Sequence, residues 1–191
     1  VAPGEVAHTP VRFRKGVRGL VAKEEKAEFG KLKWDDCYLD IGAKDLDQAK
    51  TMVRVGDTAV YATPTVRQGE AVLSPYLDDR IACAVLLSAL EQLGESSNDL
   101  YFVFTAQEEV GLRGARASAW SVDPDYGIVV DVTYSNDTPG GGRTGTSKLG
   151  EGAAIKLMDC SVICRPELVA KLEELARAGQ IPAQRDIISD G

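Results

Sequence analysis

The sequence has very little histidine, no long apolar run and no excess of positive charge. A single histidine, His8, stands among 191 residues, which excludes a site built from several histidines of this chain. The longest apolar run, Ile81–Leu90, is interrupted by Ser88 and is far shorter than the roughly 20 residues that cross a bilayer. A net charge of −7 argues against a nucleic-acid binder, whose surface would be basic.

The cysteines lack the spacing of a disulfide or zinc framework. None of the four forms a Cys-x-x-Cys pair, and Cys160 and Cys164 are the nearest two. Cys83 stands in an apolar helical pattern, which is typical of a small buried thiol. No charged and apolar stretch of the secretion type opens the chain. We therefore expect reduced thiols and a cytoplasmic protein that binds neither nucleic acid nor membrane.

Residues 1–66 predict a small β-rich module. Three short alternating or apolar runs are typical of strands: Val17–Lys23, Cys37–Ile41 and Ala59–Ala62. Residues 45–53 have helical character, and Asp45 stands where a helix cap is expected.

Residues 67–191 alternate between strand and helix patterns. Two apolar runs predict covered strands, Leu100–Phe104 and Tyr126–Asp131. Periodic apolar residues predict the helices Asp79–Leu93, Gly111–Trp120 and Pro166–Gly179. The first helix should bury Cys83, Leu86, Leu87, Leu90 and Leu93, and the last should bury Leu168, Leu172, Leu175 and Ala176. This rhythm predicts an α/β fold, a mostly parallel sheet with helices on both faces, preceded by the β-rich module.

Acidic residues stand where these elements meet. Asp78 and Asp79 precede the first helix, Glu108 and Glu109 follow one predicted strand, and Asp131 ends another. Ligand sites in such sheets lie beyond the carboxyl ends of the strands, and clustered carboxylates either retain protons or bind cations. Each pair alone also has an ordinary interpretation, as a helix cap or as a solvated loop. Their combination favours a crevice that binds a pair of divalent metals.

Several motifs together resemble the dinuclear metal aminopeptidases of the tetrahedral (TET) type, which include the deblocking and glutamyl aminopeptidases. The matching stretches are Ser74–Arg80, Gln107–Ala115, Asp131–Thr133, Asp137–Gly140, Lys148–Gly150 and Ile163–Pro166. The resemblance spans essentially the whole chain. Some members of that family carry an endoglucanase, or cellulase M, label.

The resemblance implies a role for each motif residue. Asp78 corresponds to the carboxylate that bridges two metals, and Glu108 to the general base that activates water. Glu109 and Asp131 each correspond to a ligand of one metal. It also implies two divalent ions (zinc, with cobalt or manganese as alternatives), peptide substrates with a free N-terminus, and a homo-oligomer ranging from a dimer to a dodecamer built through the β-rich module.

Two departures from the family pattern stand out. The family has glycine two residues after the arginine of its Asp-Asp-Arg motif, where this chain has Ala82. The family also has two histidine ligands, one upstream of the β-rich module and one downstream of the stretch matching residues 187–191. The sequence contains neither of them. We therefore expect an internal stretch of a longer enzyme, with an incomplete catalytic domain in residues 67–191 that is inactive or nearly so by itself.

Two other functions stay open from the sequence. A glycoside hydrolase would use Glu108 with Asp78 or Asp131, but only Trp34 and Trp120 offer indole rings for sugar stacking. A non-catalytic module would act only in building an oligomer. The sequence leaves the preferred N-terminal residue and the native metal undetermined.

Overall fold

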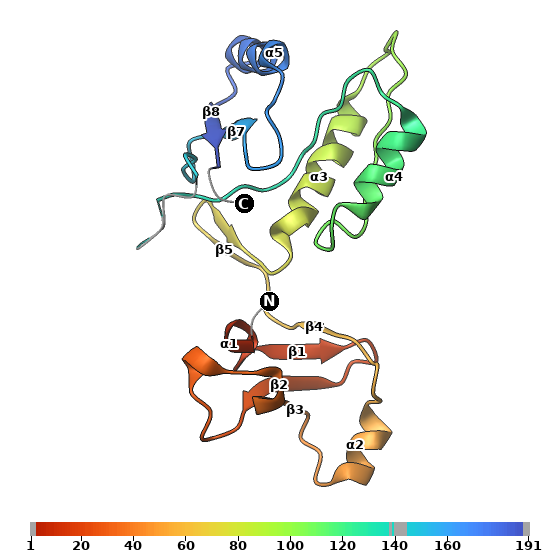
Figure 1. Ribbon diagram of the computed structural model, residues 1–191, viewed down its shortest axis with the longest axis vertical. Coiled ribbons are helices and arrows are strands. Elements are labelled where there is room, and N and C mark those ends of the chain that lie inside the picture. The colour runs from red at the N-terminus through yellow and green to blue at the C-terminus, as the bar shows by residue number, and fades with distance from the viewer. Residues whose placement is uncertain (1–2, 138, 140–144, 189–191) are drawn as a thin grey trace. The chain divides into compact units, whose positions relative to one another are not determined.

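A computed structural model describes residues 3–137, 139 and 145–188 (Figure 1). The chain divides into two compact units, Val1–Leu77 and Asp78–Gly191. The division follows a two-stranded hairpin of β5 (Val66–Gln68) and β6 (Ala71–Leu73), whereas the sequence places the boundary at residues 66–67, where the hairpin begins. Parts of two motifs, Asp137–Gly140 and residues 187–191, lie outside the described residues.

The first unit contains an antiparallel sheet with the strand order β3-β2-β1-β4 (Figure 1). The strands are β1 (Pro10–Phe13), β2 (Arg18–Lys23), β3 (Cys37–Asp40) and β4 (Ala59–Tyr61). The three strands predicted here are confirmed, and β1 is an addition that the sequence pattern did not indicate. Val6, Val11 and Val21 form the buried core of this unit, with Tyr61 packed against them.

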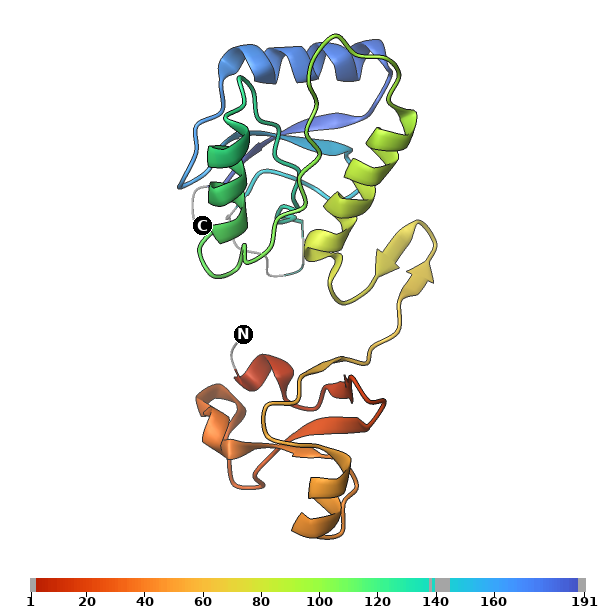
Figure 2. The same cartoon turned by 90° about the vertical axis from the view of Figure 1, so that its right-hand side faces the viewer.

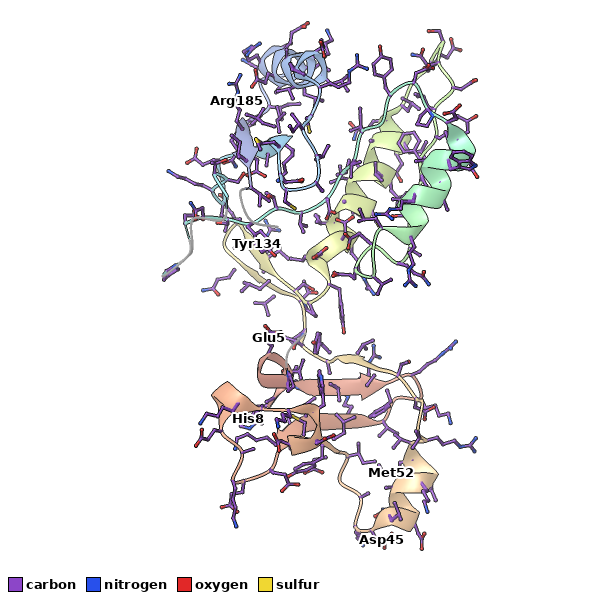
Figure 3. The ribbon with its side chains drawn as sticks, viewed as in Figure 1. Glu5, His8, Asp45, Met52, Tyr134 and Arg185 are labelled. Carbon is purple, nitrogen blue, oxygen red and sulfur yellow. The ribbon has the colours of Figure 1, made fainter. Side chains whose placement is uncertain are left out.

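Short helices complete the first unit. They are α1 (Pro3–Val6), the 3-10 turns η1 (Phe29–Lys31) and η2 (Trp34–Asp36), and α2 (Leu46–Met52). The predicted cap of α2 is confirmed, because the Asp45 carboxylate accepts a hydrogen bond from the Gln48 N–H at 2.8 Å. Figure 3 labels Asp45 and Met52 at the two ends of this helix.

The second unit contains a parallel βαβ arrangement. Strand β7 (Ala153–Met158) pairs in parallel with β8 (Ala183–Ile187), and helix α5 (Pro166–Ala178) connects them. Figure 2 shows α5 lying along the β7–β8 pair. Two more helices, α3 (Leu77–Gln92) and α4 (Arg113–Val122), confirm the helix predictions to within a few residues. The mixed α/β fold is therefore as the sequence predicts.

The two covered strands predicted in the second unit are wrong. Residues 100–104 and 126–131 form no strand, and their side chains are largely exposed, with Tyr101 at 65% and Val129 at 90%. A strand needs the backbone hydrogen bonds of a neighbouring strand, and these stretches are paired with none in the part of the chain that the structure describes. Their apolar composition alone does not supply that neighbour.

The predicted buried faces of the helices are also wrong in part. In α3 only Ala82 is buried, while Leu87 and Leu90, and Leu93 just after the helix, are about half exposed. In α5 the buried residue is Val169, and Leu175 is exposed. An apolar stripe is buried only where another element covers it. Across residues 3–137, 139 and 145–188, no helix combines the length and apolar content needed to cross a membrane.

Candidate metal centre

The segment that begins α3 has an irregular backbone at its two aspartates. Both Asp78 (φ −81°, ψ 111°) and Asp79 (φ −114°, ψ 38°) depart from helical geometry, and the peptide bond between them is cis. The Asp79 carboxylate accepts a hydrogen bond from the Ala82 N–H, so the helix-cap interpretation holds for this residue. Ala82, which replaces the glycine of the family pattern, is 2% exposed.

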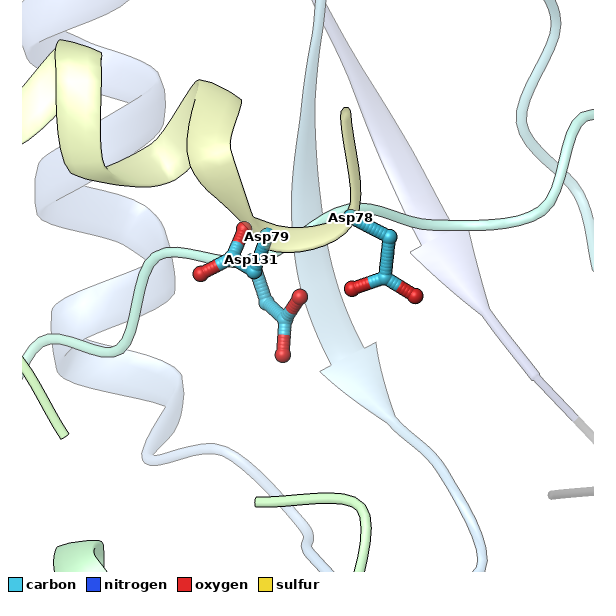
Figure 4. A group of neighbouring side chains, drawn as sticks. All are labelled: Asp78, Asp79 and Asp131. Atoms are coloured by element: carbon cyan, nitrogen blue, oxygen red, sulfur yellow. The ribbon is translucent and has the colours of Figure 1, made fainter. Parts of the chain in front are cut away.

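Three carboxylates converge at this point. Asp78, Asp79 and Asp131 each offer an oxygen, and these oxygens lie within 4.8 Å of one another (Figure 4). Asp131 follows residues 126–130, which belong to no helix or strand, and its Oδ1 accepts a hydrogen bond from the Val132 N–H at 2.7 Å. The structure therefore brings together two of the predicted ligands. Asp79 joins them; the sequence pattern groups it with Asp78 at the acidic crevice, but the family resemblance gives it no ligand role.

The electrostatics of the cluster favour a bound cation. Burial raises the pKa of the Asp79 carboxyl, and the negative charges of Asp131 and Asp78 raise it further, against the Ala82 hydrogen bond that lowers it. Oδ1 of Asp79 is buried and has no hydrogen-bond partner among the described residues. A cation would supply that partner and relieve the repulsion among the carboxylates. Carboxylate oxygens are ligands that divalent metals accept, so these residues fit such an ion.

The two glutamates stand in a tight turn before α4. The N–H groups of Gly111 and Leu112 both donate to the Glu108 carbonyl, at 3.0 and 2.9 Å, which closes the turn. Partial desolvation raises the pKa of the Glu108 carboxyl, and the charges of Glu109 and then Asp131 add to the effect. The negative charges of the aspartate cluster therefore contribute to the raised pKa of Glu108, although the Glu108 side chain is exposed. Among the described residues, the carboxylate group that could hold a metal ion does not include Glu108 or Glu109.

The lone histidine lies in the first unit, where Figure 3 labels it. The His8 ring packs edge-on against Phe29, with the ring centroids 5.3 Å apart, and the backbone N–H of His8 donates to the Val21 carbonyl at 2.7 Å. These contacts agree with the interpretation of His8 as a structural or surface residue. All four cysteines are free thiols.

Curated proteins similar to this chain are aminopeptidases. A putative aminopeptidase of Acetivibrio thermocellus is 47% identical over 182 residues, covering 95% of this chain and 55% of that protein. The lysyl aminopeptidase of Pyrococcus furiosus is 36% identical over 196 residues, covering 96% of this chain and 56% of that protein. The chain thus spans just over half the length of these relatives.

Solved structures share the fold. An aminopeptidase of the archaeon Desulfurococcus kamchatkensis superposes with a TM-score of 0.88 at 33% identity, over 100% of this chain and 56% of that one. The TET1 peptidase of Pyrococcus horikoshii, which can assemble into a tetrahedron or a large octahedral shell, gives 0.80 at 27% identity over 100% and 60%. A Thermotoga maritima structure named endoglucanase gives 0.78 at 25% identity over 99% and 60%.

A family model describes these similarities together. The model of the M42 glutamyl aminopeptidases matches residues 14–191, which include both aspartate segments and the glutamate turn. This range extends over nearly all of the sequence and both compact units. The chain belongs to the M42 glutamyl aminopeptidase family.

Proposed function

We propose that the protein is a metal-dependent aminopeptidase that hydrolyses N-terminal residues from peptides through a dinuclear metal site. The observation that carries the proposal is the convergence of Asp78, Asp79 and Asp131 within 4.8 Å, in a chain of the M42 family. The aminopeptidase names of the curated relatives support the reaction class.

The ligand roles follow the family resemblance. If the family roles hold here, Asp78 would be the ligand shared by two ions, and Asp131 and Glu109 would each be a ligand of one ion. Asp79 belongs to the same cluster, and its buried Oδ1, which has no hydrogen-bond partner among the described residues, offers a further acceptor. Zinc is the expected ion, with cobalt and manganese as alternatives, because carboxylate-rich sites accept all three.

The chemistry needs a base beside the metals. Divalent metals, when bound, lower the pKa of a water shared between them. Glu108 would serve as the general base, which accepts a proton from the attacking water and then gives it to the leaving amine. The acidic surroundings hold the ammonium group of the substrate, which restricts cleavage to the N-terminal residue.

The assembly is part of the proposal. We expect a homo-oligomer, between a dimer and a dodecamer, built through the β-rich module of residues 1–66. The TET1 peptidase of Pyrococcus horikoshii, which can assemble into a tetrahedron or a large octahedral shell, supports this expectation. Light scattering would measure the mass, and a monomer at every concentration would contradict an oligomeric protein.

The activity is tested on the full-length protein with aminoacyl-p-nitroanilides. We expect p-nitroaniline release that EDTA abolishes and that Zn²⁺ or Co²⁺ restores. The N-acetylated form of the same anilide should resist cleavage because it has no free amine. Absence of turnover with every metal would overturn the proposal.

A second candidate is a glycoside hydrolase, because one structural relative is named endoglucanase. Trp34 and Trp120 are exposed, at 58% and 89%, and indole rings of this kind stack on sugars. Release of reducing sugar from carboxymethylcellulose with EDTA present would favour this function over the aminopeptidase.

A further inference from the structure

A buried carboxylate outside the acidic cluster connects three separate segments of the second unit. Asp186, on β8, has an exposed fraction of 0%. Its Oδ1 accepts a hydrogen bond from Ser147 Oγ at 2.8 Å. Its Oδ2 accepts from Thr133 Oγ1 at 2.8 Å and from Lys156 Nζ, on β7, at 2.5 Å. Oδ1 thus binds the segment of Ser147 and Oδ2 binds the segment of Thr133, while the Lys156 ammonium group balances the negative charge of the Asp186 carboxylate.

The segment that carries Ser147 is itself fixed to β8. The Thr146 hydroxyl donates to the Arg185 carbonyl at 3.1 Å and accepts from the Ile187 N–H at 3.0 Å. The Gln184 side chain accepts from the Lys148 N–H and donates to the Lys148 carbonyl, both at 2.9 Å. These bonds hold residues 146–148 whether or not Ser147 reaches Asp186.

The segment that carries Thr133 has fewer supports. Residues 126–131 belong to no strand, and the hydrogen bond from Val132 to Asp131 is local, within neighbouring residues. The Asn136 N–H donates to the Ser147 carbonyl at 2.8 Å, five residues after Asp131. Thr133 is only two residues after Asp131, and its hydroxyl reaches a buried carboxylate on a strand. The Thr133–Asp186 bond is therefore placed to fix the backbone from which Asp131 extends.

We propose that Asp186 is a positioning residue of the metal centre, which holds Asp131 in place through the Thr133 hydroxyl. This inference rests on the proposed function, since it assigns Asp131 to a metal. Asp186 has no direct part in the chemistry. Groups that orient metal ligands typically change metal affinity or activity about 10- to 100-fold when removed.

The test compares two changes at the same carboxylate in the full-length protein. Thr133→Val removes the bond to Oδ2 and keeps the shape of the side chain, whereas Ser147→Ala removes the bond to Oδ1. Titration with Co²⁺ alone measures affinity, and hydrogen exchange of residues 131–134 reports the backbone without metal. We expect Thr133→Val to weaken Co²⁺ binding about tenfold and to speed exchange, with Ser147→Ala within about twofold of the wild type. Thr133→Ser keeps the hydroxyl and should restore both.

The outcomes separate this inference from the proposed function. Equal losses of Co²⁺ affinity in Thr133→Val and Ser147→Ala, or no loss in either, would show that Asp186 serves stability alone and would overturn it. A wild-type protein that neither binds Co²⁺ nor cleaves an aminoacyl-anilide would overturn the proposed function, and the inference with it. A selective loss that Thr133→Ser reverses supports the positioning role.

Discussion

Gly114 folds back onto Ala106 at the glutamate turn. The Gly114 N–H donates to the Ala106 carbonyl at 3.0 Å, and a Cβ on Gly114 would lie 2.4 Å from that same oxygen. Real Cβ atoms do not approach a backbone oxygen so closely, so only glycine fits this position. The turn that carries Glu108 and Glu109 therefore depends on a residue five positions after the second glutamate.

Gly114→Ala should lower kcat/KM strongly while it lowers the free energy of unfolding only moderately. The added methyl forces the chain away from Ala106 and displaces Glu108, and a misplacement of about 1 Å can reduce activity about 100-fold. The overpacking itself costs about 1–3 kcal/mol in free energy of unfolding. Gly94→Ala is the matched control, because no atom lies within 4 Å of its added Cβ. Equal kcat/KM values for the two variants would contradict a role of the turn.

Glu108→Gln tests the general base. The amide keeps the size of the side chain and accepts no proton, so kcat should fall about 100- to 10,000-fold. Calorimetry should show metal affinity close to that of the wild type, because Glu108 is not assigned as a ligand. Glu151→Gln, at an exposed glutamate of the same unit, is the control and should leave kcat unchanged. If Glu108→Gln keeps the kcat of the wild type, Glu108 is not the general base and another residue must accept the proton.

The 191-residue chain alone should bind divalent metals weakly and be nearly inactive. Its cluster offers carboxylates from Asp78, Asp79 and Asp131, whereas its single histidine packs on Phe29. Calorimetry with Zn²⁺ and Co²⁺ measures the affinity of this chain for each metal. Asp131→Asn should lower that affinity further, because it removes one of the three carboxylates. Two tight sites, together with turnover of an aminoacyl-anilide, would contradict this prediction.

Acid should weaken the fold through Asp186. Burial acts to raise the pKa of this carboxyl, but the hydrogen bonds from Lys156, Ser147 and Thr133 outweigh it, so the pKa is lowered below the ordinary 3.8. The stabilisation is therefore complete above that ordinary value and is lost as the pH falls through the lowered pKa. Asp186→Asn should reduce the free energy of unfolding by about 3 kcal/mol at pH 7, because it leaves Lys156 without its partner.

Urea unfolding from pH 7 down to pH 2 measures that dependence. The difference between the wild type and Asp186→Asn should narrow as the pH falls, since the amide does not titrate. Glu173→Gln is the control, because Glu173 pairs with an Arg185 side chain that is 65% exposed. Such a pair contributes less than about 1 kcal/mol. A wild-type–variant difference that stays constant to the lowest pH would rule out Asp186 as the titrating group.

Local signals in the sequence predicted where helices begin and end. Asp45 caps α2 through a bond to a residue three positions on, Pro166 is the first residue of α5, and Gly179 follows its last residue. These signals work because the groups involved are close in sequence. The acidic cluster was predicted less completely. The pattern indicated all three aspartates, but it also placed Glu108 and Glu109 at the same crevice, and among the described residues the convergent group contains only Asp78, Asp79 and Asp131.

From the residue pattern alone came the family resemblance, the positions of α2, α3, α4 and α5, and the acidic motifs from which the cluster forms. Tertiary structure decided which apolar residues are buried, because burial depends on what covers a face. The runs at residues 100–104 and 126–130 have the composition of covered strands and yet are largely exposed. Tertiary structure also decided the place of Asp186. Nothing near it in sequence marks it as special, and its environment comes from Thr133, Ser147 and Lys156, which lie 30 or more residues away.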